Sequence, residues 1–281
     1  MNINTHFPSY LLPVETAKSA DQNQAFNNND TEVQAPSGTR KKRGVADPRK
    51  LWPQHSTVSI SLIGMTDEQK ALTKQNILKW QPHINLKLEF IDTDEGDIRI
   101  MPYIHNRGGG ESSVGKDSQH GREFGPSMYI GFTNDPQETG RIIQHEFGHA
   151  LGLKHEHQHP GNRLKYDYEA VVGLLGENRA TTEFFTRHNP DTTTQTPYDH
   201  QSIMHYHLPA EYMADGYTNA QNYELSAGDK YIARKLYPPK RVHGSSWGVA
   251  LVRNRITGGL TAFEFGLGAR GFLQTESTPP E

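Results

Sequence analysis

The chain has 281 residues, a length that allows one or two domains with a sizeable buried core. It carries 29 Lys and Arg residues against 32 Asp and Glu residues, and the formal net charge of −3 excludes binding to nucleic acid or an acidic membrane by bulk electrostatics. The sequence has no cysteine, which excludes disulfides, zinc ribbons and thiol nucleophiles. No apolar run approaches the roughly 18 residues that cross a bilayer.

Residues 1–44 have the composition of a disordered tail. They are rich in Asn, Gln and Asp and poor in large apolar residues, so they cannot bury enough surface to become ordered. The first ten residues contain no Lys or Arg, unlike a secretory signal peptide. Residues 40–43 read RKKR, which we interpret as solvated linker charge, with a processing or targeting site as the alternative.

From residue 45 onwards the pattern indicates a folded domain. Thr66 and Gln69 are typical of a capping box that opens a helix, which Pro82 stops. Ser226 and Asp229 are typical of a second cap, for a helix that ends near 237. A glycine-rich loop around 108–110 is expected to be flexible. Alternating apolar residues predict strands at 57–62, 86–90, 97–101 and 127–133, and a further helix is expected over 138–153.

Residues 145–155 read HEFGHALGLKH, the strongest signal in the sequence. On an α-helix His145 and His149 lie one turn apart and about 40° apart around the axis, so both imidazoles can point at one metal ion. Glu146 lies next to that face. Its carboxylate is therefore placed to hold a water beside the metal and not to bind the ion itself.

A straight helix would carry His155 about 9 Å beyond His149 and about 120° off its face, out of reach of the ion. Gly152 resolves this, because glycine can adopt the left-handed conformation that ends a helix and lets the chain turn back. Three neutral imidazoles leave a fourth tetrahedral position for water, which is typical of a catalytic zinc site. We therefore predict one catalytic Zn²⁺ ion bound by His145, His149 and His155.

The five fixed positions of HExxHxxGxxH would match by chance in roughly a few of ten thousand chains of this length. Two other histidines are rivals for the third ligand. His157 and His159 lie two and four residues past the expected spacing, which favours a place beside the site or at the surface for both.

These residues resemble the metzincin zinc endopeptidases, and a second segment narrows the resemblance to the astacin family. Residues 202–206 read SIMHY and follow Pro-Tyr-Asp at 197–199, which is similar to the methionine turn of astacins. The resemblance implies that Met204 forms a hydrophobic floor beneath the zinc histidines. It also implies that Tyr206 is a switchable zinc ligand that stabilises the transition-state oxyanion.

The resemblance extends from about Trp52 to Tyr237. It implies an α+β, metzincin-like fold, in which a twisted, mostly parallel sheet carries an active-site helix and a second long helix, with a less regular C-terminal subdomain. The catalytic domain would span 45–238, and 239–281 would be a glycine-rich extension that contains a hairpin. Typical astacins have paired disulfides, so this chain is more similar to cysteine-free microbial relatives.

The activity that the resemblance implies is hydrolysis of internal peptide bonds. Zinc acidifies a water molecule, and Glu146 takes the proton of that water and returns it to the leaving amine. We expect a protein or peptide substrate in extended form, paired with an edge strand near 127–130. The alternative is a zinc-containing protein or effector that binds peptides without cleaving them, and Glu146 argues against it because binding alone requires no general base.

The family resemblance also suggests a role for the tail. If 1–43 are a pro-segment, cleavage after Arg43 would leave Gly44 as the new amino terminus, with Glu156 as its partner. The alternative is an export signal, as in virulence effectors that a dedicated secretion machine moves. We expect export or secretion without a classical signal peptide, with a cytoplasmic location left open, and a monomer with no nucleic-acid or membrane partner.

Overall fold

The computed structural model describes residues 44–103, 108–120, 125–239, 247–253 and 260–266. The chain divides into two compact units, Met1–Pro239 and Lys240–Glu281. In the second unit, β8 (Trp247–Arg253) and β9 (Leu260–Gly266) pair as an antiparallel hairpin, which confirms the hairpin expected there. The predicted tail lies outside the described residues, apart from Gly44.

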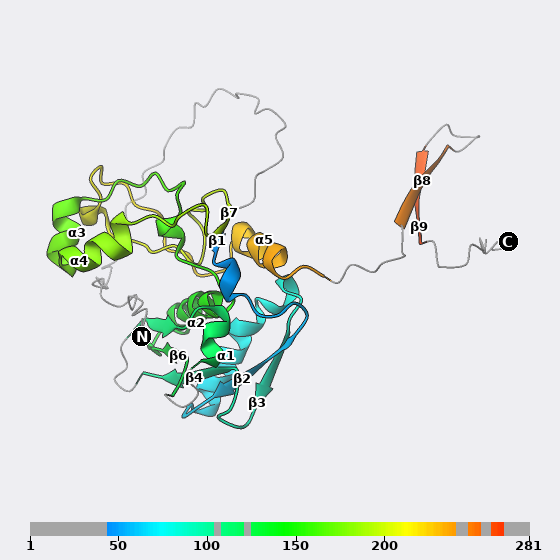
Figure 1. Cartoon of the computed structure of the whole chain (residues 1–281), viewed down its shortest axis with the longest axis horizontal. Helices are drawn as coiled ribbons and strands as arrows, with labels where there is room; N and C mark the ends of the chain where they lie inside the picture. The colour runs from blue at the N-terminus through cyan, green and yellow to red at the C-terminus, as the bar shows by residue number, and fades with distance from the viewer. Residues whose placement is uncertain (1–43, 104–107, 121–124, 240–246, 254–259, 267–281) are drawn as a thin grey trace, which may run out of the picture. The chain divides into compact units, whose positions relative to one another are not determined.

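The first unit is built on a five-stranded sheet with the order β3-β2-β4-β6-β5 (Figure 1). All neighbouring strands are parallel except β5, which runs antiparallel to β6. This is the mostly parallel sheet that the family resemblance implies. The strands are β2 (Thr57–Leu62), β3 (Lys87–Ile91), β4 (Ile98–Pro102), β5 (Gly110–Ser112) and β6 (Met128–Ile130).

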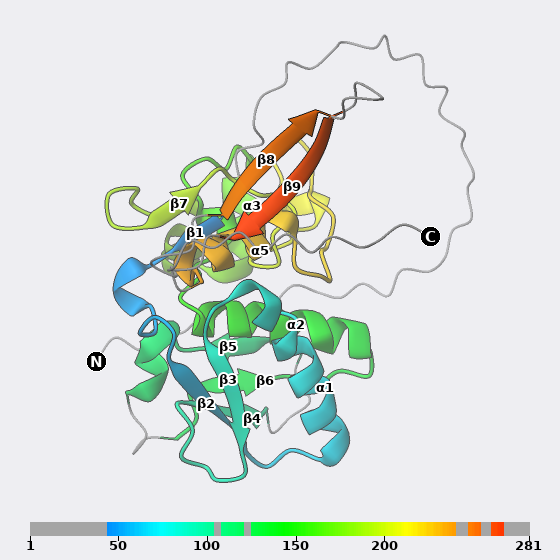
Figure 2. The same ribbon diagram turned by 90° about the vertical axis from the view of Figure 1, so that its right-hand side faces the viewer.

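Two long helices, α1 (Asp67–Leu78) and α2 (Pro136–Ala150), pack against each other, and α2 also packs on β5 and β6 (Figure 2). The indole of Trp80, just after α1, donates to the backbone oxygen of Gln144 at 3.1 Å. The side-chain amide of Gln144 donates to Asn76 Oδ1, also at 3.1 Å. Because unpaired polar groups are costly in a buried interface, these bonds fix how α1 and α2 meet.

A less regular half of the unit lies on the other side of α2 from the sheet, as both views show (Figures 1 and 2). Its α-helices and strands are β1 (Gly44–Ala46), α3 (Tyr168–Leu175), α4 (Glu177–Ala180), β7 (Thr194–Thr196) and α5 (Ala227–Leu236), with a short π-helix η7 (Thr181–Phe185). A second apolar cluster holds α3, α4 and η7 together. Its buried members are Val171, Ala180, Phe184, Tyr206, Leu208 and Met213.

Both predicted capping boxes are present. Thr66 and Gln69 exchange hydrogen bonds at the start of α1, and Ser226 and Asp229 do so at the start of α5. Helix α2 begins at Pro136, two residues before the expected start. The Asp135 side chain caps it by accepting a hydrogen bond from the backbone N–H of Gln137.

The expectation that residues 127–130 form an edge strand was wrong, because β6 lies between β4 and β5. The edge strand on that side of the sheet is β5, and it begins at Gly110, where a flexible loop was expected. A strand of three residues that begins with glycine shows no alternation that sequence reasoning could detect. The edge beside α2 is therefore Gly110–Ser112.

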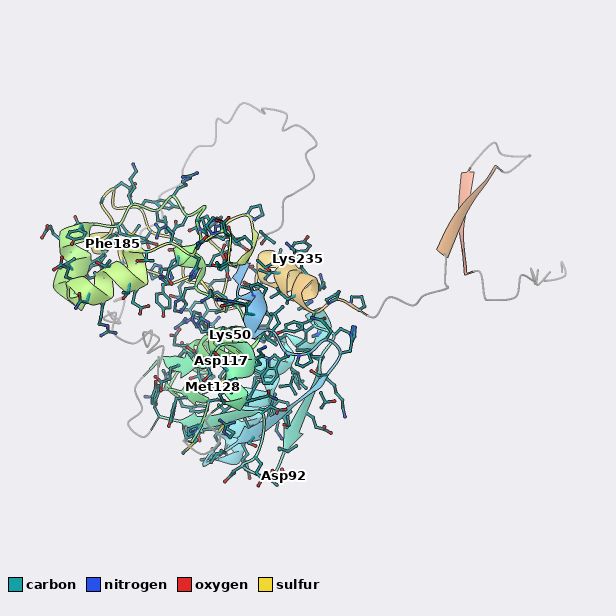
Figure 3. All side chains as sticks on the ribbon, in the orientation of Figure 1. Lys50, Asp92, Asp117, Met128, Phe185 and Lys235 are labelled. Atoms are coloured by element: carbon teal, nitrogen blue, oxygen red, sulfur yellow. The ribbon has the colours of Figure 1, made fainter. Side chains whose placement is uncertain are left out.

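Strand β1 pairs antiparallel with β7, and the backbone N–H of Lys154 donates to the carbonyl of Val45 at 3.0 Å. Just beyond β1, Lys50 forms an ion pair with Asp117 (Figure 3). These contacts hold the first described residues against the rest of the domain. Among the residues that the structure describes, no helix has the length and apolar character needed to cross a membrane.

Candidate metal and catalytic centre

Helix α2 carries the first three residues of the predicted site. From Thr139 to its end every residue of α2 is buried, because the sheet covers one side of the helix and the less regular half covers the other. His145 and His149 lie one turn apart on this helix, with exposed fractions of 4% and 1%. The helix therefore presents both imidazoles from a rigid, buried element.

Helix α2 ends at Ala150, three residues before the predicted end, and the predicted reversal at Gly152 follows it. Gly152 has a φ of +93°, in the left-handed region that favours glycine, and its N–H donates to the carbonyl of His149 at 2.8 Å. The N–H of Leu153 donates back to the carbonyl of Gly148 at 3.0 Å. The chain therefore reverses within a few residues and returns to the site at His155.

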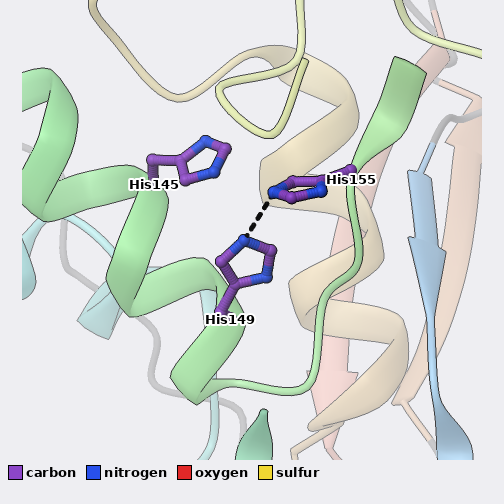
Figure 4. Close-up of side chains that lie close together, drawn as sticks. All are labelled: His145, His149 and His155. Carbon is purple, nitrogen blue, oxygen red and sulfur yellow. Dashed lines mark hydrogen bonds between the residues drawn. The ribbon is translucent and has the colours of Figure 1, made fainter. Parts of the chain in front are cut away.

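The structure brings the three predicted histidines together (Figure 4). One ring nitrogen from each of His145, His149 and His155 lies within 4.8 Å of the other two, and His149 Nε2 is 3.0 Å from His155 Nε2. Tetrahedral zinc with Zn–N bonds of about 2.0–2.1 Å separates its ligand nitrogens by about 3.3 Å. His149 and His155 are already close to this spacing, and all three imidazoles are near enough to one another to hold one zinc ion.

Backbone carbonyls orient two of these rings. His145 Nδ1 lies 2.8 Å from the carbonyl oxygen of Ile203, and His149 Nδ1 lies 2.9 Å from that of Leu153. A ring that donates through Nδ1 keeps the lone pair of Nε2 for a metal. Buried, neutral imidazoles are ligands that zinc accepts and that magnesium and calcium do not favour.

Glu146 is buried beside the histidines, with an exposed fraction of 3%. Burial raises the pKa of its carboxyl to about 8, although the charge of Arg141 opposes the shift. Within the described part of the chain, its Oε2 atom has no hydrogen-bond partner. Its side chain packs on β5, where a Cβ added at Gly110 would lie 2.5 Å from Glu146 Cγ. A buried carboxyl with an unpaired oxygen is typical of a group that acts on a bound molecule.

Met204 packs on α2 at Gly148, between the turns of the helix that carry His145 and His149. Its side chain is 2% exposed, and a Cβ added at Gly148 would lie 2.4 Å from its sulfur. Gly148 thus leaves the space that the methionine occupies. The backbone N–H of Glu156 donates to the carbonyl of Met204 at 2.9 Å, which ties the segment of the third histidine to this turn.

Asp229 anchors the same turn, a role that its helix-capping pattern did not reveal. Its carboxylate accepts from the Ser202 hydroxyl at 2.6 Å and from the Ile203 N–H at 2.8 Å. The same carboxylate accepts from the Ser226 N–H at the start of α5. The capping box was visible in the sequence, but the turn that it also holds is distant along the chain.

Tyr206 is buried next to the histidines, and its ring centroid lies 4.3 Å from that of His155 and 5.8 Å from that of His145. Burial raises the pKa of its phenol well above the ordinary value. The phenol is therefore a neutral O–H group at neutral pH. The methionine turn directly precedes Tyr206 in the chain and so brings its ring to the histidines.

The two rival histidines are not part of the metal group. His157 Nε2 lies 2.7 Å from the carbonyl oxygen of Glu183, and His159 Nε2 lies 2.6 Å from that of Thr196. Both side chains are buried, and both rings are fixed by backbone groups outside the site. The group of potential metal ligands found in the described residues consists of His145, His149 and His155.

A mostly parallel sheet with an antiparallel edge, a buried HExxH helix and a methionine turn define a metzincin-type zinc site. The family model for Astacin, a family of peptidases, matches residues 44–225. The chain therefore belongs to the astacin family.

Individual relatives agree with this assignment. Bone morphogenetic protein 1 of Xenopus laevis is 27% identical over 217 residues, which cover 70% of this chain and 28% of the relative. Zinc metalloproteinase nas-14 of Caenorhabditis elegans is 27% identical over 210 residues, 69% of this chain and 38% of the relative. This chain thus spans well under half the length of both. The solved structure of myroilysin matches with a TM-score of 0.65 at 27% identity, over 70% of this chain and 100% of myroilysin.

Proposed function

We propose that this chain is a zinc-dependent endopeptidase that hydrolyses internal peptide bonds of proteins. The observation that carries the proposal is the buried Glu146 carboxyl, which has an unpaired oxygen next to three histidines that fit one zinc ion. A peptide-binding protein without catalysis would have no use for an unpaired carboxyl in this place, since it costs free energy to bury. Membership of a peptidase family supports the same function.

His145, His149 and His155 would hold the zinc ion. When bound, zinc supplies a Lewis acid that polarises a carbonyl and acidifies water. Glu146 then removes the proton of the attacking water and delivers it to the nitrogen of the leaving amine. The carboxyl suits both steps because its unpaired oxygen is free to accept a proton and to pass it on. The phenol of Tyr206 donates a hydrogen bond to the oxyanion that develops on the scissile carbonyl.

Strand β5 is the surface that we propose for the substrate. It is one of the two edge strands of the sheet, and its first residue, Gly110, packs against the Glu146 side chain. An extended peptide that adds to this edge would be held by main-chain hydrogen bonds, largely independent of its sequence. It would also lie beside the carboxyl that transfers the proton. Protein or peptide substrates follow from this arrangement.

We also propose that cleavage after Arg43 matures the enzyme. Gly44 is buried at the start of β1 and directly follows the basic residues 40–43. Its φ is +146°, and a Cβ there would lie 2.7 Å from Ile232, so the chain starts β1 in a place that only glycine fits. Glu156, the proposed partner of the new terminus, is 1% exposed, and its Oε1 accepts from the Asp199 N–H at 2.7 Å. Mass spectrometry that finds a fully active chain still starting at residue 1 would contradict this proposal.

For the location, we propose that the protein is exported, which its membership of the astacin family supports. We propose a monomer as the active form.

The test of the proposed activity is cleavage of a denatured protein, with the fragments mapped by mass spectrometry. The full chain is stripped of metal with a chelator, and one half is supplied with one equivalent of Zn²⁺. We expect internal fragments from the zinc-loaded half and none from the stripped half. Bound zinc without cleavage would overturn the proposal in favour of peptide binding.

A further inference from the structure

The ring of Tyr206 packs beside two imidazoles from one short segment, whose own centroids are 5.1 Å apart. Its centroid is 4.3 Å from that of His155 with the planes tilted by 47°, and 4.4 Å from that of His157 with the planes only 16° apart. The contact with His157 is therefore a nearly parallel stack. A nearly parallel stack opposes a tilt of the Tyr206 ring out of its plane but permits movement of the ring within that plane.

His157 is itself held firmly. Its side chain is fully buried, and Nε2 donates to the carbonyl of Glu183 at 2.7 Å. The Phe184 ring lies 5.1 Å from the imidazole, and the Asn162 side chain donates to the His157 carbonyl at 2.6 Å. These contacts fix both the backbone and the ring plane. His157 is therefore a rigid surface against which Tyr206 can rest.

The other ring nitrogen shows that packing alone does not explain this residue. His157 Nδ1 is buried and has no hydrogen-bond partner in the part of the chain that the structure describes. Burying an unpaired polar atom costs free energy, so an apolar side chain would fill the space more favourably. The imidazole of His157 packs its flat face against Tyr206, and its Nε2 donates a hydrogen bond to η7 that fixes the orientation of the ring.

We propose that His157 is a positioning residue for Tyr206, which keeps the phenol in the plane from which it reaches the oxyanion. The inference rests on the role proposed for Tyr206 above. A misplaced group near the reacting atoms lowers the rate by up to about 100-fold. We expect loss of the stack to lower kcat by about 10-fold to 100-fold and to leave KM nearly unchanged, because the phenol acts in the transition state.

Three variants test this in the full chain loaded with zinc. His157→Ala removes the flat face, whereas His157→Phe keeps it and loses the bond to Glu183. His159→Ala is the matched control, because His159 is also buried and bonded to a backbone carbonyl but has its ring beside Tyr198 and not Tyr206. We expect low kcat for His157→Ala, substantial rescue by His157→Phe, and wild-type kcat for His159→Ala. Equal kcat for His157→Ala and wild type, at equal zinc content, would overturn the inference.

A double-mutant cycle with Tyr206→Phe separates this inference from the proposed function. If His157 acts through the phenol, His157→Ala will lower kcat little further once the hydroxyl is absent. If the fold-losses in kcat of the two single variants instead multiply in the double variant, the inference is overturned and the proposed role of Tyr206 is unaffected. A Tyr206→Phe variant with wild-type kcat would instead overturn the proposed role of Tyr206, and the inference with it.

A readout without metal or substrate completes the test. In metal-free protein with ¹³C-labelled tyrosine rings, the signal that disappears in Tyr206→Phe belongs to Tyr206. We expect His157→Ala to shift and broaden that signal, because the ring loses its stacked neighbour, and His159→Ala to leave it in place. An unchanged Tyr206 signal in His157→Ala would show that the stack does not hold the phenol.

Discussion

His149 Nε2 lies 3.0 Å from His155 Nε2, although the end of a helix separates these two residues. The contact depends on the reversal at Gly152, whose N–H bonds to the His149 carbonyl. The segment after the reversal also supplies the Leu153 carbonyl that orients His149. One turn thus orients the second histidine and delivers the third.

The first prediction concerns this turn. We expect Gly152→Ala to destabilise the fold by about 1–2 kcal/mol, because alanine is strained in the left-handed region. The added Cβ would also lie 2.9 Å from Leu51 Cδ2. A displaced turn should weaken zinc binding as well, which titration with a zinc chelator measures.

The control for that variant is Gly173→Ala. Gly173 lies within α3, and a Cβ there meets nothing within 4 Å. We expect a gain in stability of about 0.5–1 kcal/mol from helix propensity, without a change in zinc affinity. Equal effects of the two substitutions would show that the turn has no special requirement for glycine.

The second prediction concerns the contact between Gly148 and Met204. An added Cβ would lie 2.4 Å from the methionine sulfur, so we expect Gly148→Ala to cost about 1–3 kcal/mol of stability through overpacking. Combining it with Met204→Ala should cost less than the sum of the two single substitutions, because the truncated side chain leaves room for the new methyl group. The free energies of unfolding are measured in urea. If the changes caused by the two substitutions are strictly additive, the two side chains are not in steric contact.

The third prediction concerns Asp229, which joins α5 to the methionine turn. Asp229→Ala leaves buried donors of Ser202 and Ile203 unpaired, so we expect a loss of at least about 2 kcal/mol. Because the Ile203 carbonyl orients His145, zinc affinity should fall as well. Asp167→Ala is the control, since Asp167 caps only α3 and should cost about 1 kcal/mol with no effect on zinc. Wild-type zinc affinity in Asp229→Ala would contradict the proposed link.

The fourth prediction is a pH dependence of zinc retention. A histidine binds zinc only when it is neutral, so protons compete with the metal below the ordinary histidine pKa of about 6.5. The stability that zinc contributes is therefore present at neutral pH and lost as the pH falls. We expect zinc content after dialysis to be near one per chain at about pH 7.5 and near zero at about pH 4. Equal zinc content at both values would contradict a site made of three histidines.

Local signals in the sequence were enough to predict much of this fold. Capping boxes predicted the starts of α1 and α5 because a cap involves residues only three apart. The zinc histidines were predictable for a similar reason, since helix geometry relates His145 to His149 and glycine explains the return to His155.

What sequence reasoning missed depends on contacts between distant segments. The edge strand at Gly110–Ser112 is defined by pairing with β6, and its three residues carry no pattern of their own. The stack of His157 on Tyr206 joins two segments that are far apart in the chain, so the spacing rule could say only that His157 lies outside the metal site. The second role of Asp229 was hidden in the same way.

The central claim is that Glu146 transfers the proton in a zinc-dependent cleavage. Zinc content and the cleavage rate of a denatured protein should be measured on the same preparation of Glu146→Gln, a variant that keeps the size of the side chain. We predict about one zinc ion per chain and a rate lower than that of the wild type by about 10²-fold to 10⁴-fold, because the general base is lost while the three histidines remain. A zinc-loaded Glu146→Gln variant that cleaves at the wild-type rate would contradict the account.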